Sequence, residues 1–351
     1  MFNLLMRAGP RLSRGLIACI AALSACGYMG LFVAGQALLP AFLFRDAEKI
    51  QAQMDGSTTY DGSSFDSVGK FYSMFGPSLL NVFVIAIGVI FIWSMLKRVR
   101  HAGGLGIALL LGAPCVFFNL FVASKDTLVV AMSLLIVWTL RREREGFTAF
   151  IACAVYVVYA LLVRRYFLLI IGAAAGVWLF RCAGMRARLA MIGLALLSLF
   201  LLPSAAYMAL LHPRDMAVDY LVYQSPYGAR TSFYNLLEPD SFSSFCIDYL
   251  YAMLRLHLPV LFSPDPRGIA MQVFVVAAWR AAWTPRRSID ASPGLAVFAC
   301  LVMGHILVSM LFEPDLGSYV RHLSSVSLLC MVLFSTRSHA SAGRLEPISA
   351  R

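Results

Sequence analysis

Charged residues are scarce in this sequence. Asp, Glu, Lys and Arg make up 13% of its 351 residues, and hydrophobic residues make up 60%, whereas an ordinary soluble domain carries about 25% charged residues. Several apolar runs approach or exceed the length of about 20 residues that a helix needs to cross a bilayer, and the mean hydropathy is +0.77. This composition excludes a soluble globular protein and predicts an all-α, polytopic integral membrane protein.

The sequence also lacks the patterns of a metal site, a disulfide framework or a nucleic-acid-binding surface. Its eight cysteines form no C-x-x-C pair and mostly lie inside apolar runs, where free cysteine behaves as a small hydrophobe. The net charge of +11 is divided among short basic clusters and forms no basic stripe with interleaved aromatics. We therefore expect no metal, no cofactor and no nucleic-acid partner.

Apolar segments long enough to cross a membrane, or nearly so, follow one another along the chain. About ten spans are expected, at 16–44, 78–96, 105–122, 127–140, 147–163, 166–180, 189–211, 269–283, 293–312 and 319–335. Basic clusters, which favour the cytoplasmic side of a membrane, lie at alternate ends of these spans, at 7–14, 97–101, 141–144, 181–188, 286–287 and 337–351. Both termini are therefore expected in the cytoplasm.

This topology predicts a single membrane domain over residues 1–351. The polar segment 45–77 is expected to be the first outer loop, and 337–351 the cytoplasmic tail. A large outer segment, 212–267, contains the apolar stretch 249–262, which is interrupted by charged residues and a proline. We expect that stretch to be a helix lying on the membrane surface, with one more span as the alternative.

The positive-inside rule disfavours basic residues on the outer side of this topology, and seven of those that fall there are candidates for a function. Several of them lie next to apolar runs. Ionisable groups at membrane depth are costly and tend to face a cavity or one another, so their default interpretation is functional. The seven residues are Lys125, Arg164, Arg165, Arg214, Arg230, Arg255 and Arg321.

Three short motifs carry most of these charges. Ser124-Lys125-Asp126 either caps a helix, with its lysine directed to the surface, or places an anion ligand beside a base. Arg164-Arg165-Tyr166 separates two apolar segments with almost no loop, so its guanidiniums reach either lipid phosphates or a dedicated pyrophosphate. Tyr319-Val320-Arg321-His322 follows a break that contains proline and glycine, and its arginine is either an interface anchor or an anion ligand.

A cluster of outer cations suits a lipid pyrophosphate headgroup better than a soluble metabolite. Guanidiniums can bind pyrophosphate through paired hydrogen bonds and stabilise it as a leaving group without a metal. A sugar hydroxyl would then attack, with Asp126 or His322 as the base. The predicted catalytic residues are Asp126, Arg165, Arg321 and His322, and the predicted substrate-binding residues are Lys125, Arg164, Tyr166, Tyr319, Arg214 and Arg255.

With these three motifs in a multispan chain, the sequence resembles the Wzy-type polysaccharide polymerases of bacteria, and more broadly the membrane glycosyltransferases that use polyprenyl-linked sugars. The resemblance implies a protein of the bacterial inner membrane that joins saccharide units carried on polyprenyl pyrophosphate. By motif position, Arg164, Arg165 and Arg321 would engage the pyrophosphate of the donor. The partners implied are this lipid-linked saccharide and membrane lipid, and a chain-length regulator stays open.

Other functions stay open. Acidic residues just after the first span, here Asp46 and Glu48, are typical of GT-C type transferases that use a polyprenyl-phosphate sugar, and either residue could be the base. A flippase or transporter of lipid-linked saccharides would also need outer-facing positive charge, although such proteins usually carry it in a central cavity between duplicated helix sets. A purely structural membrane subunit is the third alternative.

Overall fold

The computed structural model describes residues 2–140, 145–225, 230–283 and 293–342. Helices make up 79% of the structure, and the described ranges contain no strand, so the all-α prediction is confirmed. Two expected basic clusters, 141–144 and 286–287, and the end of the expected tail, 343–351, lie outside the described residues.

The chain divides into two compact units where a single domain was expected. Unit 1 comprises Met1–Leu168, Arg280–Ala299 and Ser324–Arg351, and unit 2 comprises Leu169–Trp279 and Cys300–Leu323. Each unit has its own buried polar cluster, so each is described by itself below.

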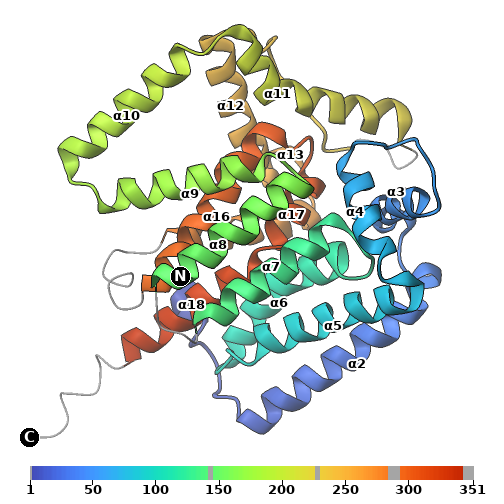
Figure 1. Ribbon diagram of the computed structural model, residues 1–351. Helices are drawn as coiled ribbons and strands as arrows, with labels where there is room; N and C mark the ends of the chain where they lie inside the picture. Colours follow the sequence, from blue (N-terminus) through green and yellow to red (C-terminus); the bar gives the residue numbers. More distant parts are fainter. Residues whose placement is uncertain (1, 141–144, 226–229, 284–292, 343–351) are drawn as a thin grey trace, which may run out of the picture. The chain divides into compact units, whose positions relative to one another are not determined.

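Unit 1 is organised around its last helix, α18 (Figure 1). This helix contacts α1, α5, α6 and α7, and its side chains from Leu328 to Phe334 are buried. The helices of this unit are α1 (Phe2–Leu5), α2 (Arg14–Leu38), a 3-10 turn (Ala41–Leu43), α3 (Arg45–Met54), α4 (Ser64–Ser73), α5 (Gly76–Leu96), α6 (Ala102–Asn119), α7 (Lys125–Thr139), α8 (Glu145–Leu162) and α18 (Ser327–Ala342).

Helix α2 packs along α5, and Tyr28 is a buried aromatic side chain of α2 in this packing. The Tyr28 hydroxyl donates to the carbonyl oxygen of Leu120 at 2.6 Å. A Cβ atom at Gly88 would lie 2.3 Å from the Tyr28 ring, a distance that no real contact reaches, so the ring can lie there only because residue 88 is glycine. Apart from this contact most of α2 is exposed, as expected of a helix that faces lipid.

The segment 45–77, expected as a polar loop, instead forms a helical hairpin of α3 and α4. Ser63 caps α4 by accepting from the backbone nitrogens of Phe65 and Asp66. Ile50, Val68 and Tyr72 bury one face of the hairpin in a common apolar cluster. Three or four apolar residues at helical spacing therefore suffice to order a segment whose overall composition is polar.

Unit 2 contains the expected span 189–211 as two helices bent by 92°. Pro203 lies at the break, where its ring and missing N–H prevent a continuous helix. Tyr207, Leu211 and Phe245 pack together beyond the bend. The helices are α9 (Phe167–Cys182, from residue 169 on), α10 (Met185–Phe200), α11 (Ser204–Asp219), a π-helical turn (Tyr220–Gln224), α12 (Phe242–His257), α13 (Pro259–Phe262), α14 (Pro266–Ala282), most of α16 (Pro293–Phe312) and α17 (Leu316–Ser324).

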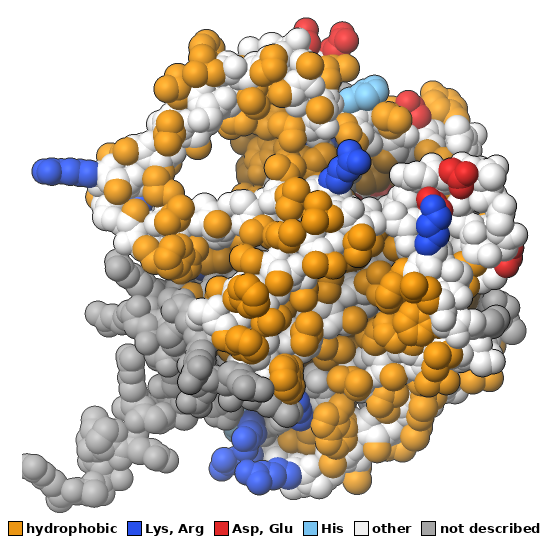
Figure 2. Space-filling view, in the orientation of Figure 1, with side chains coloured by type: hydrophobic (Ala, Val, Ile, Leu, Met, Phe, Trp, Pro, Cys, Tyr) orange, Lys and Arg blue, Asp and Glu red, His pale blue; other side chains and the backbone are white. Residues whose placement is uncertain are grey.

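Four described helices are long and apolar enough to cross a membrane, or up to six spans if bent helix pairs count as one span each. The four are α2, α5, α6 and α16, whereas α8 and α9 are apolar but shorter. Exposed hydrophobic side chains are spread widely over the face shown in Figure 2. Helices of this length and hydropathy are typical of a membrane protein. Helix α12, which includes most of the expected surface helix, is not among the candidate spans and ends just before Pro259.

Candidate functional site

The start of α7 is set by local hydrogen bonds. The Ser124 hydroxyl accepts from the backbone nitrogen of Thr127 at 3.1 Å, and the Thr127 hydroxyl accepts in return from the backbone nitrogen of Ser124. This capping box satisfies donors that would otherwise be left at the first turn. The helix-cap interpretation of the Ser124-Lys125-Asp126 motif is therefore confirmed for Ser124.

Lys125 is buried and does not reach outward to the surface. Its Nζ atom lies 3.4 Å from the centroid of the Phe65 ring and 3.3 Å from the Ser64 hydroxyl oxygen. Both partners belong to α4, so the hairpin lies against the first turn of α7. The Tyr72 hydroxyl, also on α4, donates to the carbonyl oxygen of Ser124 at 2.8 Å and holds the two elements together.

Asp126 and Arg164 form a buried ion pair. The distance from Arg164 Nη1 to Asp126 Oδ1 is 3.1 Å, and the same nitrogen donates to the Tyr166 hydroxyl at 3.0 Å. Asp126 is 1% exposed and Arg164 is 9% exposed. Burial by itself would lower the pKa of Arg164, but the surrounding acidic groups, which include Asp126 and Asp46, raise it, so the guanidinium stays charged.

The neighbouring predicted residues divide into buried and exposed ones. Asp46, one of the two alternative bases, is 7% exposed and contributes to the field at Arg164. Glu48, the other alternative base, is exposed. Arg165 is also exposed, and its side chain makes no ion pair with a described residue. Arg165 is thus a solvent-facing guanidinium directly beside a buried charge cluster.

The α3–α4 hairpin also carries a polar pocket of about 500 Å³. Ser57, Thr58, Asp61 and Asp66 are among the residues that line it. Asp66 accepts from Lys70 Nζ at 2.8 Å and from the Gly62 backbone nitrogen, and these bonds lower the pKa of its carboxyl. The segment 45–77 was expected to be a loop, although the serine at position 63 and the Asp66–Lys70 spacing both indicate a helix.

The motif at 319–322 lies on α17 in unit 2. Asp315 begins this helix by accepting from the Ser318 backbone nitrogen and hydroxyl, both at 2.9 Å. His322 Nδ1 bonds to a carboxylate oxygen of Glu313, and Arg321 is partly buried. Tyr319 is fully buried, and its hydroxyl lies 2.9 Å from His257 Nε2.

His257 and Glu313 were not among the predicted site residues. His257 ends α12, and burial lowers the pKa of its imidazole to about 4. The edge of the Trp279 ring packs against it, with 5.3 Å between ring centroids. Nothing in the local sequence indicates that His257 would meet Tyr319, because 62 residues separate them.

Arg214 and Arg255, both predicted to bind substrate, contact other parts of unit 2. Arg214 is 0% exposed and donates to Asn235 Oδ1 at 2.8 Å and to the carbonyl oxygen of Met310. Arg255 stacks on the Phe262 ring at 4.3 Å from its centroid. These contacts give Arg214 a role in joining α11 to α16.

The structure therefore groups the predicted residues by unit. Unit 1 brings together Lys125, Asp126, Arg164, Tyr166 and Asp46, with Arg165 exposed beside them and Glu48 exposed on α3. Unit 2 holds Tyr319, Arg321 and His322 on one helix, and Arg214 and Arg255 on two others. Among the described residues, no three His, Cys, Asp or Glu side chains are arranged to hold a metal ion.

Comparisons with known proteins add no family assignment. No protein-family model matches the chain, and no curated protein or solved structure is significantly similar to it. The resemblance to polysaccharide polymerases thus rests on the three motifs, and the function that follows from them is a proposal.

Proposed function

We propose that this protein is a membrane glycosyltransferase that joins saccharide units carried on polyprenyl pyrophosphate, as the Wzy-type polymerases do. Its product would be a surface polysaccharide, and its partners would be the lipid-linked saccharide, the surrounding membrane lipid and a regulator of chain length. The site that we assign to this reaction is the start of α7 together with the turn between α8 and α9.

One observation carries the proposal: the buried Asp126–Arg164 ion pair stands beside the exposed guanidinium of Arg165. A buried ion pair contributes little to stability because both ions lose their hydration. Its presence at a helix start, next to an exposed cation, is therefore better explained by a reaction that needs fixed charges. Of these three residues, Arg165 is the one whose side chain is exposed, so it is the one that a phosphate group would contact.

The residues can be given roles in a balanced reaction. A sugar hydroxyl attacks the anomeric carbon of the lipid-linked saccharide, the new glycosidic bond forms, and the bond to the pyrophosphate oxygen breaks. The hydroxyl proton passes to the Asp126 carboxylate, which Arg164 holds in place, and Tyr166 in turn accepts from the same Arg164 nitrogen. Arg165 balances the negative charge that develops on the leaving pyrophosphate.

The polar pocket of the α3–α4 hairpin suits the acceptor saccharide. Sugars are bound through hydroxyl, carboxylate and amide groups, and Ser57, Thr58, Asp61 and Gln53 supply these at the pocket wall. The same hairpin contributes Ser64 and Phe65 to the surroundings of Lys125. One element thus carries both a candidate sugar pocket and a wall of the charge cluster.

The proposal places the protein in the inner membrane of a bacterium, with both termini in the cytoplasm and the charge cluster at the outer face. The proposal keeps the topology of ten spans. The additional crossings, beyond the four to six that satisfy length and hydropathy, would be made by the shorter apolar helices.

A second candidate function is supported by the burial of Asp46. In a GT-C type transferase an acid after the first span acts as the base, and here Asp46 is buried within the field of Arg164 whereas Glu48 is exposed. The two functions assign the base to different residues, so single substitutions separate them.

Complementation of a deletion strain tests the proposal. Arg165→Ala removes an exposed side chain and should leave single saccharide units on lipid with no polymer. Arg186→Ala, an equal loss of charge at an exposed arginine in α10, is the matched control and should restore normal polymer. All variants are compared at equal amounts in the membrane.

The outcome also separates the alternatives. If Asp46→Ala alone abolishes the product and the lipid-linked unit lacks one sugar, the GT-C function replaces the polymerase. If Arg165→Ala, Asp126→Asn and Asp46→Ala all make normal polymer, the charge cluster is only structural and the proposal is wrong.

A further inference from the structure

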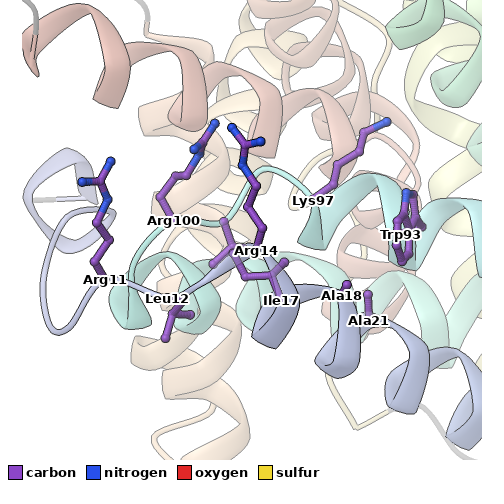
Figure 3. Close-up of a pocket in the computed structure, with 10 residues that line it drawn as sticks. Arg11, Leu12, Arg14, Ile17, Ala18, Ala21, Trp93, Lys97 and Arg100 are labelled. Atoms are coloured by element: carbon purple, nitrogen blue, oxygen red, sulfur yellow. The ribbon is translucent and has the colours of Figure 1, made fainter.

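A second group of cations lies where α2 begins and α5 ends. Arg11, Arg14, Lys97 and Arg100 line a pocket of about 450 Å³ there. All four side chains are exposed, and none of the described residues that line the pocket is acidic. Figure 3 shows the four side chains extending in the same direction. Like charges gathered in this way repel one another, so the pocket favours an anion.

Backbone pairing holds the two basic segments together. The Leu12 nitrogen donates to the Arg100 carbonyl oxygen at 3.0 Å, and the Ala102 nitrogen donates to the Pro10 carbonyl oxygen at 3.1 Å. Gly103 permits the close approach, because a Cβ atom there would lie 2.0 Å from the Leu5 carbonyl oxygen. The cations are therefore positioned by the fold before any ligand arrives, which lowers the entropy cost of binding.

The pocket is charged at one end and apolar at the other. The two candidate spans cover Arg14–Gly35 and Ser78–Leu96, so the four cations lie at or beyond the ends of the spans. Ala18, Ala21 and Trp93 also line the pocket, and all three lie inside the spans. The Trp93 ring is 48% exposed, and tryptophan is enriched at membrane interfaces.

From this arrangement we propose that the pocket binds an anionic phospholipid. The phosphate lies against Arg11, Arg14 and Arg100, and an acyl chain follows the surface of Ala18, Ala21 and Trp93. Bidentate guanidinium–phosphate bonds supply the polar half of the recognition, and burial of the chain supplies the other half.

This lipid is distinct from the substrate of the proposed transferase. The α3–α4 hairpin is inserted between the other ends of the same two helices, since it follows α2 and precedes α5 in the chain. The pocket and the hairpin therefore lie at opposite ends of the α2–α5 pair. The lipid would occupy the membrane leaflet opposite to the one where the transfer reaction takes place.

Lipid binding can be measured on the full-length protein purified in a neutral detergent. Phosphatidylglycerol is titrated, and the apparent affinity is read from the rise of the unfolding temperature and from lipid adducts in native mass spectrometry. Phosphatidylcholine tests the need for net negative charge, and soluble glycerol 3-phosphate tests whether the headgroup alone is the ligand.

The pocket variant combines Arg11→Gln with Arg100→Gln. Its matched control is Arg98→Gln, a change outside the pocket. Arg98 is adjacent in sequence but donates to the Ser94 carbonyl oxygen at 2.6 Å and does not line the pocket. We expect the pocket variant to bind phosphatidylglycerol at least about tenfold more weakly, with an unchanged unfolding temperature without lipid. Trp93→Ala should also weaken binding, whereas Arg98→Gln should bind as the wild type does.

Three results would overturn the proposal. Equal binding of phosphatidylcholine would show that the cations do not recognise net charge. Saturation of the effect by glycerol 3-phosphate would show a site for free anions, with no part for the acyl chain. Equal loss of affinity in Arg98→Gln and in the pocket variant would show general attraction to a basic surface. None of these results depends on polymerase activity.

Discussion

Each unit contains a polar cluster, and the two clusters differ in whether their side chains change protonation with pH. The cluster at the start of α7 pairs Asp126 with Arg164, and a guanidinium stays protonated at every pH that a cell experiences. The cluster around α17 contains the imidazole of His257, which bonds to Tyr319 and whose pKa is lowered to about 4 by burial, and the contact of His322 with Glu313. The first suits a site that must always present charge, and the second makes the stability of its unit depend on pH.

The clusters differ in burial as well. Arg164, Asp126 and Lys125 are all under 10% exposed, and the covering hairpin arises from a segment of polar composition. Around α17 the histidines are partly exposed while Tyr319 is fully buried. The difference indicates that unit 1 isolates fixed charges from water, whereas unit 2 leaves the imidazoles of this cluster partly exposed.

The largest effect is expected from Arg164→Ala. This change leaves the buried Asp126 carboxylate without its guanidinium, and breaking a buried pair in this way costs about 3–5 kcal/mol of the free energy of unfolding. We expect a sharp loss of folded protein in detergent, measured by thermal unfolding and by recovery after size-exclusion chromatography. An unfolding temperature equal to the wild type would show that the pair does not hold α7 to the α8–α9 turn.

The double variant Arg164→Leu with Asp126→Leu separates stability from activity. Replacing both ions by apolar residues removes the desolvation cost and should recover most of the lost stability. Polymer should still be absent, because the base is gone. Normal polymer from a stable double variant would show that the ion pair has no part in catalysis.

The second largest effect is the pH dependence of unit 2. Burial lowers the pKa of His257 to about 4 from the ordinary value of 6.5, so the unfolded chain binds a proton that the folded chain excludes. The contribution is fully present above pH 6.5 and is lost as the pH falls from 6.5 to about 4. The loss amounts to about 3 kcal/mol.

Unfolding measured across this pH range, with His257→Gln as the comparison, tests the effect. Glutamine keeps a hydrogen-bonding group but does not titrate, so its stability should fall less between pH 6.5 and 4. If the two proteins lose stability in parallel, other groups cause the acid sensitivity and His257 does not distinguish the clusters.

A smaller effect is expected from Tyr319→Phe. The change removes the hydroxyl that bonds to His257 Nε2 but keeps the buried ring, so it should cost about 1 kcal/mol. Thermal unfolding near pH 7.5 gives the value, and the same measurement on His257→Gln shows whether the two losses are additive. Additive losses would mean that the pair does not interact.

The smallest effect on stability, and one of the largest on function, is expected from Arg165→Ala. An exposed side chain with no ion pair to a described residue should change the free energy of unfolding by no more than about 0.5 kcal/mol. Polymer should nevertheless be lost. A large loss of stability would place Arg165 with the buried residues and remove the contrast between it and Arg164.

Helix positions could be predicted where apolar residues are continuous. The spans expected at 78–96 and 293–312 correspond to α5 and α16 with differences of at most two residues at an end. The cap at Ser124 was also predictable, because serine before an apolar helix is a local signal. Pro203 should have indicated the break in the expected span 189–211, since its effect on a helix is local too.

The rest depends on contacts between distant parts of the sequence. The α3–α4 hairpin is ordered by Ile50, Val68 and Tyr72 packing together, and few apolar residues over a polar segment give a weak periodic signal. The pairing of His257 with Tyr319 and of Asp126 with Arg164 requires the fold. The two-unit organisation has no signal in composition at all.

The most direct test of the proposed site is a reaction with purified components. The protein is placed in lipid nanodiscs with lipid-linked saccharide extracted from the deletion strain, and the release of polyprenyl pyrophosphate is measured over time. We expect release by the wild type and by Arg186→Ala, and a rate at least about 100-fold lower for Arg165→Ala, since loss of a group that stabilises developing charge has effects of this size. Equal rates for Arg165→Ala and the wild type would contradict the assignment of Arg165 to the leaving pyrophosphate.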